Sequence, residues 1–178
     1  SAASDVYKRQ ASRALMRFSI QLPEGERLAS GSTFRHAVAV SPDSRWVAYA
    51  SYRPGEGDAP DGEPMINLRR LDRTNVRRIP GMNPFFSPDS RQLGFVEPGL
   101  EGRFRIRRTP VEGGPVEVVT EFDDPSGLGG YGCAWLSNDL VVFSPREEGG
   151  LFAVPAVGGD PQPLTPLDTK AGESSHRL

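Results

Sequence analysis

A glycine-rich stretch at residues 127–132, Gly-Leu-Gly-Gly-Tyr-Gly, has the G-x-G-x-x-G spacing of phosphate-binding loops. A dinucleotide site of this kind also needs a strand before the glycines and a helix after them, and a protein-kinase site needs a lysine on a nearby strand. Here a strand-like apolar run follows Gly132, and the only later lysine is Lys170. We therefore interpret the glycines as a flexible crossover between two repeats.

Serine-hydrolase chemistry needs a nucleophile, a histidine and an acid. The sequence has no G-x-S-x-G pattern and contains two histidines. His36 begins an apolar run, where it would either line a channel and touch a ligand or hydrogen-bond a neighbouring unit, and His176 belongs to an unfinished repeat. The single cysteine, Cys133, also lies in an apolar run, so we predict a buried spectator thiol, with a reactive thiol as the alternative.

An acidic loop at residues 54–64 carries Glu56, Asp58, Asp61 and Glu63, which is the type of side chain that calcium prefers. An EF-hand loop needs ligands at alternate positions followed by glycine, whereas Asp58 and Asp61 are separated by two residues, one of them proline. We interpret the loop as a mobile insertion between two strands. The sequence thus predicts no catalytic, cofactor-binding or metal-ligating residue in this chain, and no cofactor.

The pentapeptide Ser-Pro-Asp-Ser-Arg occurs at residues 41–45 and again at 87–91, with apolar runs before and after each copy. A degenerate third copy begins at Leu136, and the positions Ser41, Ser87 and Leu136 are 46 and 49 residues apart. Such a period is typical of propeller blades or helical arrays. Proline presets a turn, and the serine and aspartate beside it can bond main-chain amides. Asp43 and Asp89 are therefore predicted to be turn residues.

The runs beside each turn are short and rich in Val, Phe, Tyr and Trp, which indicates strands joined in a hairpin. Trp46 and Tyr49, after the first turn, are expected to be buried between units. A second strand pair follows in each unit, at residues 66–71 with 76–79, 104–109 with 116–120, and 151–155 with 162–165. Antiparallel four-stranded units with apolar inner strands and wetter outer strands predict an all-β fold, the β-propeller.

The predicted organisation has a leader at residues 1–16, of which 1–10 resemble the spurious ends of translated reads, and a partial propeller at residues 17–178. Blades are expected at about residues 34–80, 83–120 and 131–166, and a fourth begins at 172–178. Residues 17–22 are expected to form a lone strand. Since propellers have about four to eight blades, we predict three four-stranded antiparallel blades of an incomplete six- or seven-bladed propeller, with the remaining blades supplied by sequence outside the chain.

Charge is unevenly distributed although the net charge is only −2. Residues 68–108 carry ten arginines against four acids, while residues 109–178 carry eleven acids against three basic residues. A basic patch can bind nucleic acid or anionic lipid. These arginines alternate with apolar residues along the outer strands, so we expect a solvated face partly paired with acids of the next blade, and no nucleic-acid partner. No apolar run approaches the roughly 18 residues of a membrane span.

Residues 40–49, their copy at 86–95, and the Leu-Phe-Ala-Val-Pro-Ala-Val-Gly-Gly segment at 151–159 resemble the TolB-type, WD-repeat-like repeats of β-propellers. Residues 17–28, followed by these repeats, resemble the propeller region C-terminal to bacterial serine/threonine protein kinase domains. The third repeat departs from the pattern, because its turn, Ser137-Asn138-Asp139, is one residue shorter.

This resemblance implies a non-catalytic recognition or sensory platform with a protein or peptide partner, and it offers no catalytic residue to place on the sequence. Three classes remain open: an interaction or sensor module of a serine/threonine kinase, the gating propeller of a prolyl-oligopeptidase-like hydrolase, and a TolB-like periplasmic scaffold. The expected location is the periplasmic side for a membrane-anchored kinase or a TolB-like protein, and the cytoplasm otherwise.

Overall fold

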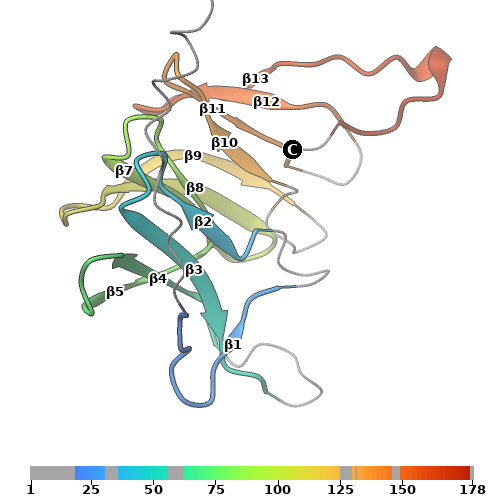
Figure 1. The fold of residues 1–178 in the computed structure, drawn as a ribbon. Coiled ribbons are helices and arrows are strands. Elements are labelled where there is room, and N and C mark those ends of the chain that lie inside the picture. Colours follow the sequence, from blue (N-terminus) through green and yellow to red (C-terminus); the bar gives the residue numbers. More distant parts are fainter. Residues whose placement is uncertain are drawn as a thin grey trace, which may run out of the picture.

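The computed structural model describes residues 19–30, 36–55, 62–124, 130, 132–145 and 149–176. Three antiparallel sheets lie face to face in chain order (Figure 1). The first, blade 1, contains β1 (Arg27–Leu28), β2 (Val38–Val40), β3 (Trp46–Tyr52), β4 (Met65–Arg70) and β5 (Val76–Pro80). Blade 2 contains β6 (Met82–Phe86), β7 (Gln92–Pro98), β8 (Arg103–Pro110) and β9 (Glu117–Asp123), and blade 3 contains β10 (Cys133–Trp135), β11 (Leu140–Phe143), β12 (Phe152–Pro155) and β13 (Gln162–Pro163).

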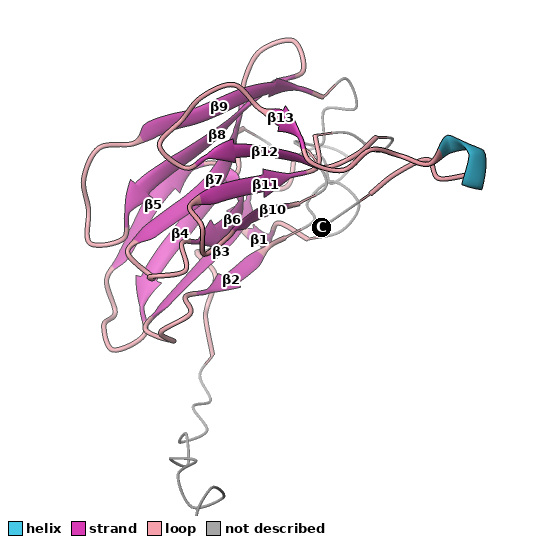
Figure 2. Ribbon diagram, turned by 90° about the horizontal axis from the view of Figure 1, so that it is seen from above, coloured by secondary structure: helices cyan, strands magenta, loops and turns pink. Residues whose placement is uncertain are grey.

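The arrangement of these sheets confirms the predicted fold class, three antiparallel blades of a β-propeller with four strand positions each; blade 1 has a fifth strand because β1 and β2 share its innermost position. From β2 onward the consecutive strands of each sheet are neighbours, while β1 pairs with β3 beside β2. The first strand of the middle blade, β6, contacts both β2 and β10. The first strands of the three blades therefore converge on one side, as strands near a propeller axis do. In the described part of the chain, the one helix is a short 3₁₀ turn at Thr169–Ala171, on a loop that extends away from the sheets (Figure 2). No helix in that part is both long and apolar enough to cross a membrane.

The innermost position of blade 1 is shared by two strands. Val38 pairs with Tyr49 of β3, and Leu28 of β1 pairs with Ser51, further along the same edge. The strand expected at residues 17–22 is not found in its described part, because residues 19–22 belong to no strand. The reason is that β3 has seven residues and β2 only three, so β3 has further backbone groups to pair. Residues 27–28 supply that pairing instead.

Burial of the innermost strands differs from one blade to another. All five residues of β6 are buried, in agreement with strands covered on both faces. In β2, by contrast, Val38 and Val40 are 50% and 52% exposed. Their side chains lie on the face of blade 1 opposite to Ala39, which packs toward blade 2. Within the described residues, β2 is therefore covered on its Ala39 face alone, since blade 1 is the first of the three stacked blades and packs against blade 2 on that side.

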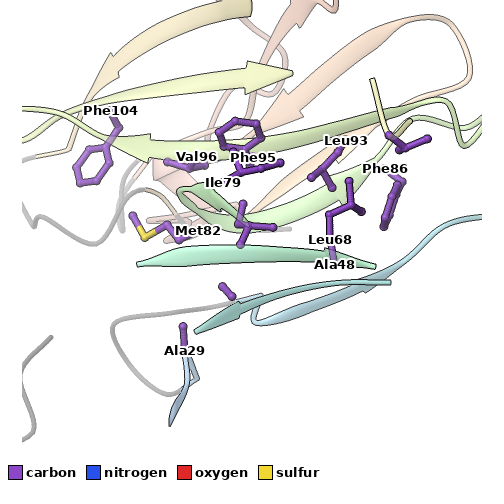
Figure 3. Close-up of a cluster of buried hydrophobic side chains, with 13 residues drawn as sticks. Ala29, Ala48, Leu68, Ile79, Met82, Phe86, Leu93, Phe95, Val96 and Phe104 are labelled. Atoms are coloured by element: carbon purple, nitrogen blue, oxygen red, sulfur yellow. The ribbon is translucent and has the colours of Figure 1, made fainter. Parts of the chain in front are cut away.

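Two apolar clusters join the blades. The first lies between blades 1 and 2 (Figure 3) and unites Ala48, Ile66 and Leu68 with Leu93 and Phe95. The second lies between blades 2 and 3, where Phe85 and Ile106 meet members of blade 3 such as Val141, Phe143 and Val154. Burial of this apolar surface is what holds one blade against the next.

Gly94 shows how closely the inner strands approach. It lies opposite Phe85 in the β6–β7 pair, and a Cβ atom on Gly94 would stand 2.3 Å from the Phe85 ring. The phenyl ring therefore lies over the glycine backbone, a place that any other residue would fill. An alanine at this position would force the ring away from the interface with blade 3.

Candidate functional site: the groove between the first two repeat turns

The two Ser-Pro-Asp-Ser-Arg turns have the same internal hydrogen bonds. In the first, the Ser41 hydroxyl donates to Asp43 Oδ1 (2.6 Å) and accepts the backbone N–H of Trp46 (2.9 Å). The carboxylate also accepts the N–H of Arg45 (3.0 Å). Ser44 takes the left-handed conformation (φ 59°) that closes the hairpin. The Ser41 and Asp43 side chains thus satisfy backbone N–H groups of the tight reversal.

The second turn repeats this pattern with Ser87, Asp89, Ser90 and Arg91. The Ser87 hydroxyl donates to Asp89 Oδ1 (2.6 Å), and that oxygen accepts the Arg91 N–H (3.0 Å). Ser90 is left-handed, with φ 63°. The prediction that Asp43 and Asp89 serve as turn residues is confirmed.

The hydrogen bonds keep both carboxylates ionised. The Ser87 hydroxyl and the Arg91 backbone N–H hold the pKa of Asp89 below its ordinary value. At Asp43 partial burial acts in the opposite direction, but the bonds from Ser41 and from the Arg45 N–H outweigh it, and the pKa of Asp43 is also lowered. Both side chains are therefore negative at neutral pH.

The third turn lacks the serine hydroxyl that organises the first two turns. Leu136 stands where the other turns have serine, and the loop is closed by backbone bonds from Leu136 N–H to Leu140 O (2.8 Å) and from Asp139 N–H to Leu136 O (3.1 Å). Asp139, at φ 59°, occupies the left-handed position that Ser44 and Ser90 occupy elsewhere. The shorter turn keeps the backbone geometry and loses the side-chain bonds.

A groove of about 500 Å³ lies between the first two turns. The backbone N–H of Asp43 donates to the Ser90 hydroxyl (3.0 Å), which ties the turns together at one side of it. We call this the turn groove, and its lining comes from both blades: Asp43, Arg45, Trp46, Arg70, Asp89, Ser90, Arg91, Gln92, Pro110, Val111 and Glu112.

Trp46 and Arg70 form one wall of the turn groove. Trp46 is half-buried and not fully buried as expected, because it begins β3 at the end of the blade, whereas Tyr49 within the strand is 3% exposed. The Arg70 guanidinium carbon lies 6.0 Å from the centre of the Trp46 ring, within the range of a cation–π contact. Arg70 also binds Asp72 (2.9 Å) and, across the blade boundary, Glu112 (3.4 Å).

Most of the clustered arginines pair within their own blade. On blade 2, Arg107 binds Glu97 (2.6 Å), Arg105 binds Glu121 (2.9 Å) and Arg108 binds Glu117 (2.7 Å). The expected pairing with the next blade occurs at Arg70. Arg77 of β5 also crosses to blade 2, where it donates to the carbonyl oxygen of Pro110 (3.0 Å).

A second polar cavity, of about 390 Å³, lies at the other end of β3. Here the Glu26 side chain is only 3% exposed, and it accepts bonds from Ser51 Oγ and Arg78 (both 2.6 Å). Burial raises the pKa of Glu26, but these two bonds and the charge of Arg78 lower it more, so the net shift is downward. Asn67, fully buried, donates to Ser51 Oγ (2.7 Å) and completes a network that fastens the segment before β1 to blade 1.

The candidate residues from the sequence lie apart from the turn groove. His36 is exposed just before β2, and it is its backbone N–H that donates to Asn83 Oδ1 of blade 2 (3.3 Å), so the alternatives for its side chain stay predictions. Cys133 is half-buried between blades, and burial raises the pKa of its thiol to about 12. Residues 127–129 and 131 of the glycine stretch, and 56–61 of the acidic loop, lie outside the described residues, as do residues 1–18.

His176 has partners that the sequence did not indicate. Its Nδ1 lies 2.7 Å from Thr165 Oγ1, and its Nε2 lies 3.3 Å from Glu173 Oε2. These are the three group types of a hydrolase triad. Thr165 Oγ1, however, already accepts the Leu151 N–H (2.9 Å), and the backbone N–H of His176 donates to Gly149 O (2.8 Å). The cluster holds the C-terminal segment against blade 3.

Comparison with solved structures supports the fold. No family model and no curated protein sequence matches the chain. TolB from Acinetobacter baumannii is similar over 72% of this chain and 31% of its own, with a TM-score of 0.52 and 22% identity. The β-propeller domain of the Trilobed protease from Pyrococcus furiosus is similar over 86% of this chain and 43% of its own, with a TM-score of 0.55 and 15% identity.

A third similar structure is a puromycin-hydrolyzing peptidase from Mycobacterium tuberculosis, with a TM-score of 0.54, 19% identity, and coverage of 82% of this chain and 24% of that one. The chain spans less than half the length of each of the three proteins. At these identities the likeness concerns the fold. The chain has the fold of TolB-like β-propellers.

Proposed function

We propose that this chain is a non-catalytic propeller module that recognises a protein or peptide partner within a larger protein. The observation that carries the proposal is the turn groove, where charged and aromatic side chains from two rigidly packed blades face a cavity of about 500 Å³. Binding residues are typically placed on turns that a rigid scaffold positions. The hydrogen bonds within the turns fix that geometry before any partner arrives.

The parent protein is, in this proposal, a bacterial serine/threonine protein kinase, on the strength of the sequence resemblance at residues 17–28 and in the repeats that follow. A prolyl-oligopeptidase-like hydrolase is the second candidate, because the similar structures include peptidases. A TolB-like scaffold is the third. The intact reading frame separates them by a kinase domain upstream, a hydrolase domain downstream, or a signal peptide alone.

The non-catalytic character is tested with the purified chain and generic phosphotransferase, esterase and peptidase substrates. We expect turnover no higher than the buffer background. The informative variants are Thr165→Val and His176→Gln, since these residues form the contact that most resembles a triad. Hydrolysis by the unmodified chain that either substitution abolishes would show that the chain is an enzyme and overturn the proposal.

A further inference from the structure

We infer that the turn groove binds an extended peptide in which acidic side chains flank an apolar one. This inference rests on the proposed recognition function and specifies its partner. Three features of the groove support it: two arginines with exposed guanidinium groups, apolar side chains in the same lining, and two aspartates that are already engaged by the turns.

The available arginines are Arg45 and Arg91. The Arg45 side chain is 71% exposed, and its nearest carboxylate oxygen, on Asp43, is 4.0 Å away. Arg91 is exposed, and among the described residues its guanidinium group has no hydrogen bond or ion pair. Both follow the serine of their turn by four positions, so they occupy equivalent places on adjacent blades. A guanidinium group binds a carboxylate with two parallel hydrogen bonds.

The apolar surface comes from Trp46, Pro110 and Val111. Trp46 is half-buried, so part of its ring is accessible, while Val111 is 6% exposed and belongs to the first apolar cluster. Arg70 lies over the Trp46 ring and is held by Asp72 and Glu112. The ring is therefore positioned without a ligand, and an apolar side chain placed on it loses contact with water.

The acidic side chains in the lining of the groove favour a peptide ligand over a nucleic acid. Asp43, Asp89 and Glu112 all line the groove, and the pKa values of the two aspartates are lowered. A phosphate backbone carries a charge at every nucleotide and would meet these carboxylates. A peptide has backbone N–H groups that can donate to them, and the Gln92 amide can both donate and accept. A lining that contains both arginines and carboxylates thus suits a peptide whose own carboxylates are separated by other residues.

The test is a titration of the purified chain with two synthetic peptides at low salt, followed by tryptophan fluorescence and by calorimetry. One peptide is Gly-Glu-Leu-Glu-Gly with blocked ends, and the other replaces both glutamates with lysine. We expect saturable binding of the glutamate peptide and none of the lysine peptide. A blocked Gly-Glu-Gly-Glu-Gly peptide should bind more weakly, because it has no side chain for the Trp46 surface.

The matched variants are Arg45→Ala with Arg91→Ala, and Arg103→Ala as a control, since Arg103 is 70% exposed and lies outside the groove. Loss of one hydrogen-bonded charge pair is worth about tenfold in affinity, so we expect about a hundredfold weakening in the double variant and no change in the control. Urea unfolding of each variant establishes that the fold is intact.

Absence of binding by the glutamate peptide, equal weakening in the Arg103→Ala control, or preference for a single-stranded oligonucleotide overturns the inference. These results leave the proposed function standing if the chain also shows no turnover. Turnover that depends on Thr165 or His176 removes the proposed function, whatever the peptides do. The two failures are therefore distinguishable.

Discussion

The boundary between blades 1 and 2 and the boundary between blades 2 and 3 have similar centres and different rims. Each centre is an apolar cluster built from inner strands. At the rim of the first boundary, Arg70 binds Glu112 and Arg77 reaches the carbonyl oxygen of Pro110. At the second, the link is a backbone bond from Gly159 N–H to Val119 O (3.2 Å).

The two rims differ because single equivalent positions of the repeat carry different residues. Pro110-Val111-Glu112-Gly113-Gly114 in blade 2 and Pro155-Ala156-Val157-Gly158-Gly159 in blade 3 are equivalent turns, so Val157 stands where Glu112 binds an arginine. Val157 is 77% exposed and Val118, on the nearby β9, is 47% exposed. The comparison teaches that the apolar core specifies the stacking of blades, while a few polar positions at the rim distinguish the boundary that holds the turn groove.

The largest effects are expected from the shared feature, the apolar centre. Phe95→Ala at the first boundary and Phe143→Ala at the second each remove a ring that is 1% exposed. Each should lower the free energy of unfolding by about 3–5 kcal/mol, as measured by urea denaturation. Val118→Ala is the control, and as an exposed site it should change stability by about 0.5 kcal/mol or less. A loss of under about 1 kcal/mol at either phenylalanine would show that its boundary is not formed in solution.

A smaller effect is expected from the serines that organise the first two turns. Ser41→Ala and Ser87→Ala each remove the hydroxyl that bonds both an aspartate and a backbone N–H. Each should cost about 1–2 kcal/mol in unfolding free energy. Ser137→Ala in the third turn is the matched control, because Ser137 is exposed and no hydrogen bond of its hydroxyl is found in the described structure. If all three changes cost the same, the turns do not differ as the structure indicates.

The repeats made the fold predictable, since strand order within each blade follows from short apolar runs separated by turn residues. Residues 19–22, the described part of the strand expected at 17–22, form no strand. The strand β1 was missed because an unpaired edge at the end of β3 is not visible in a sequence. The turn groove was missed for a related reason. Arg45 and Arg91 are 46 residues apart, and only the stacking of two blades brings their turns together. The exact repeat of the pentapeptide was the one signal that could have indicated it.

The aspartates of the first two turns should make the free energy of unfolding depend on pH in the acid range. Asp43 and Asp89 have pKa values that are lower in the folded chain than in the unfolded chain, so their ionised forms stabilise the fold above the unfolded value of about 3.9. That contribution is lost as pH falls through the folded values. We expect the free energy of unfolding to decrease below about pH 4 and the decrease to be shallower in a variant with Asp43→Asn and Asp89→Asn.

Glu26 also has a lowered pKa, so the double variant should retain part of the slope. Urea denaturation at a series of pH values measures each curve. A double variant with the slope of the unmodified chain would mean that the two carboxylates do not stabilise the turns.

The smallest effect should come from the contact between the turns themselves. Ser90→Ala removes the hydroxyl that accepts the Asp43 N–H, and the expected cost is about 0.5–1 kcal/mol. Ser44→Ala is a close control, because Ser44 has nearly the same left-handed backbone (φ 59° against 63°) and is exposed. Backbone strain is therefore matched in the two variants, and a difference between them reports the hydroxyl alone. Hydrogen exchange at the Asp43 amide gives the sharper measurement, since this N–H loses its acceptor in Ser90→Ala and keeps it in Ser44→Ala. Equal protection of the Asp43 amide in both variants would mean that the two turns are not joined in solution, and the groove between them would then lack the fixed geometry on which the proposed peptide binding depends.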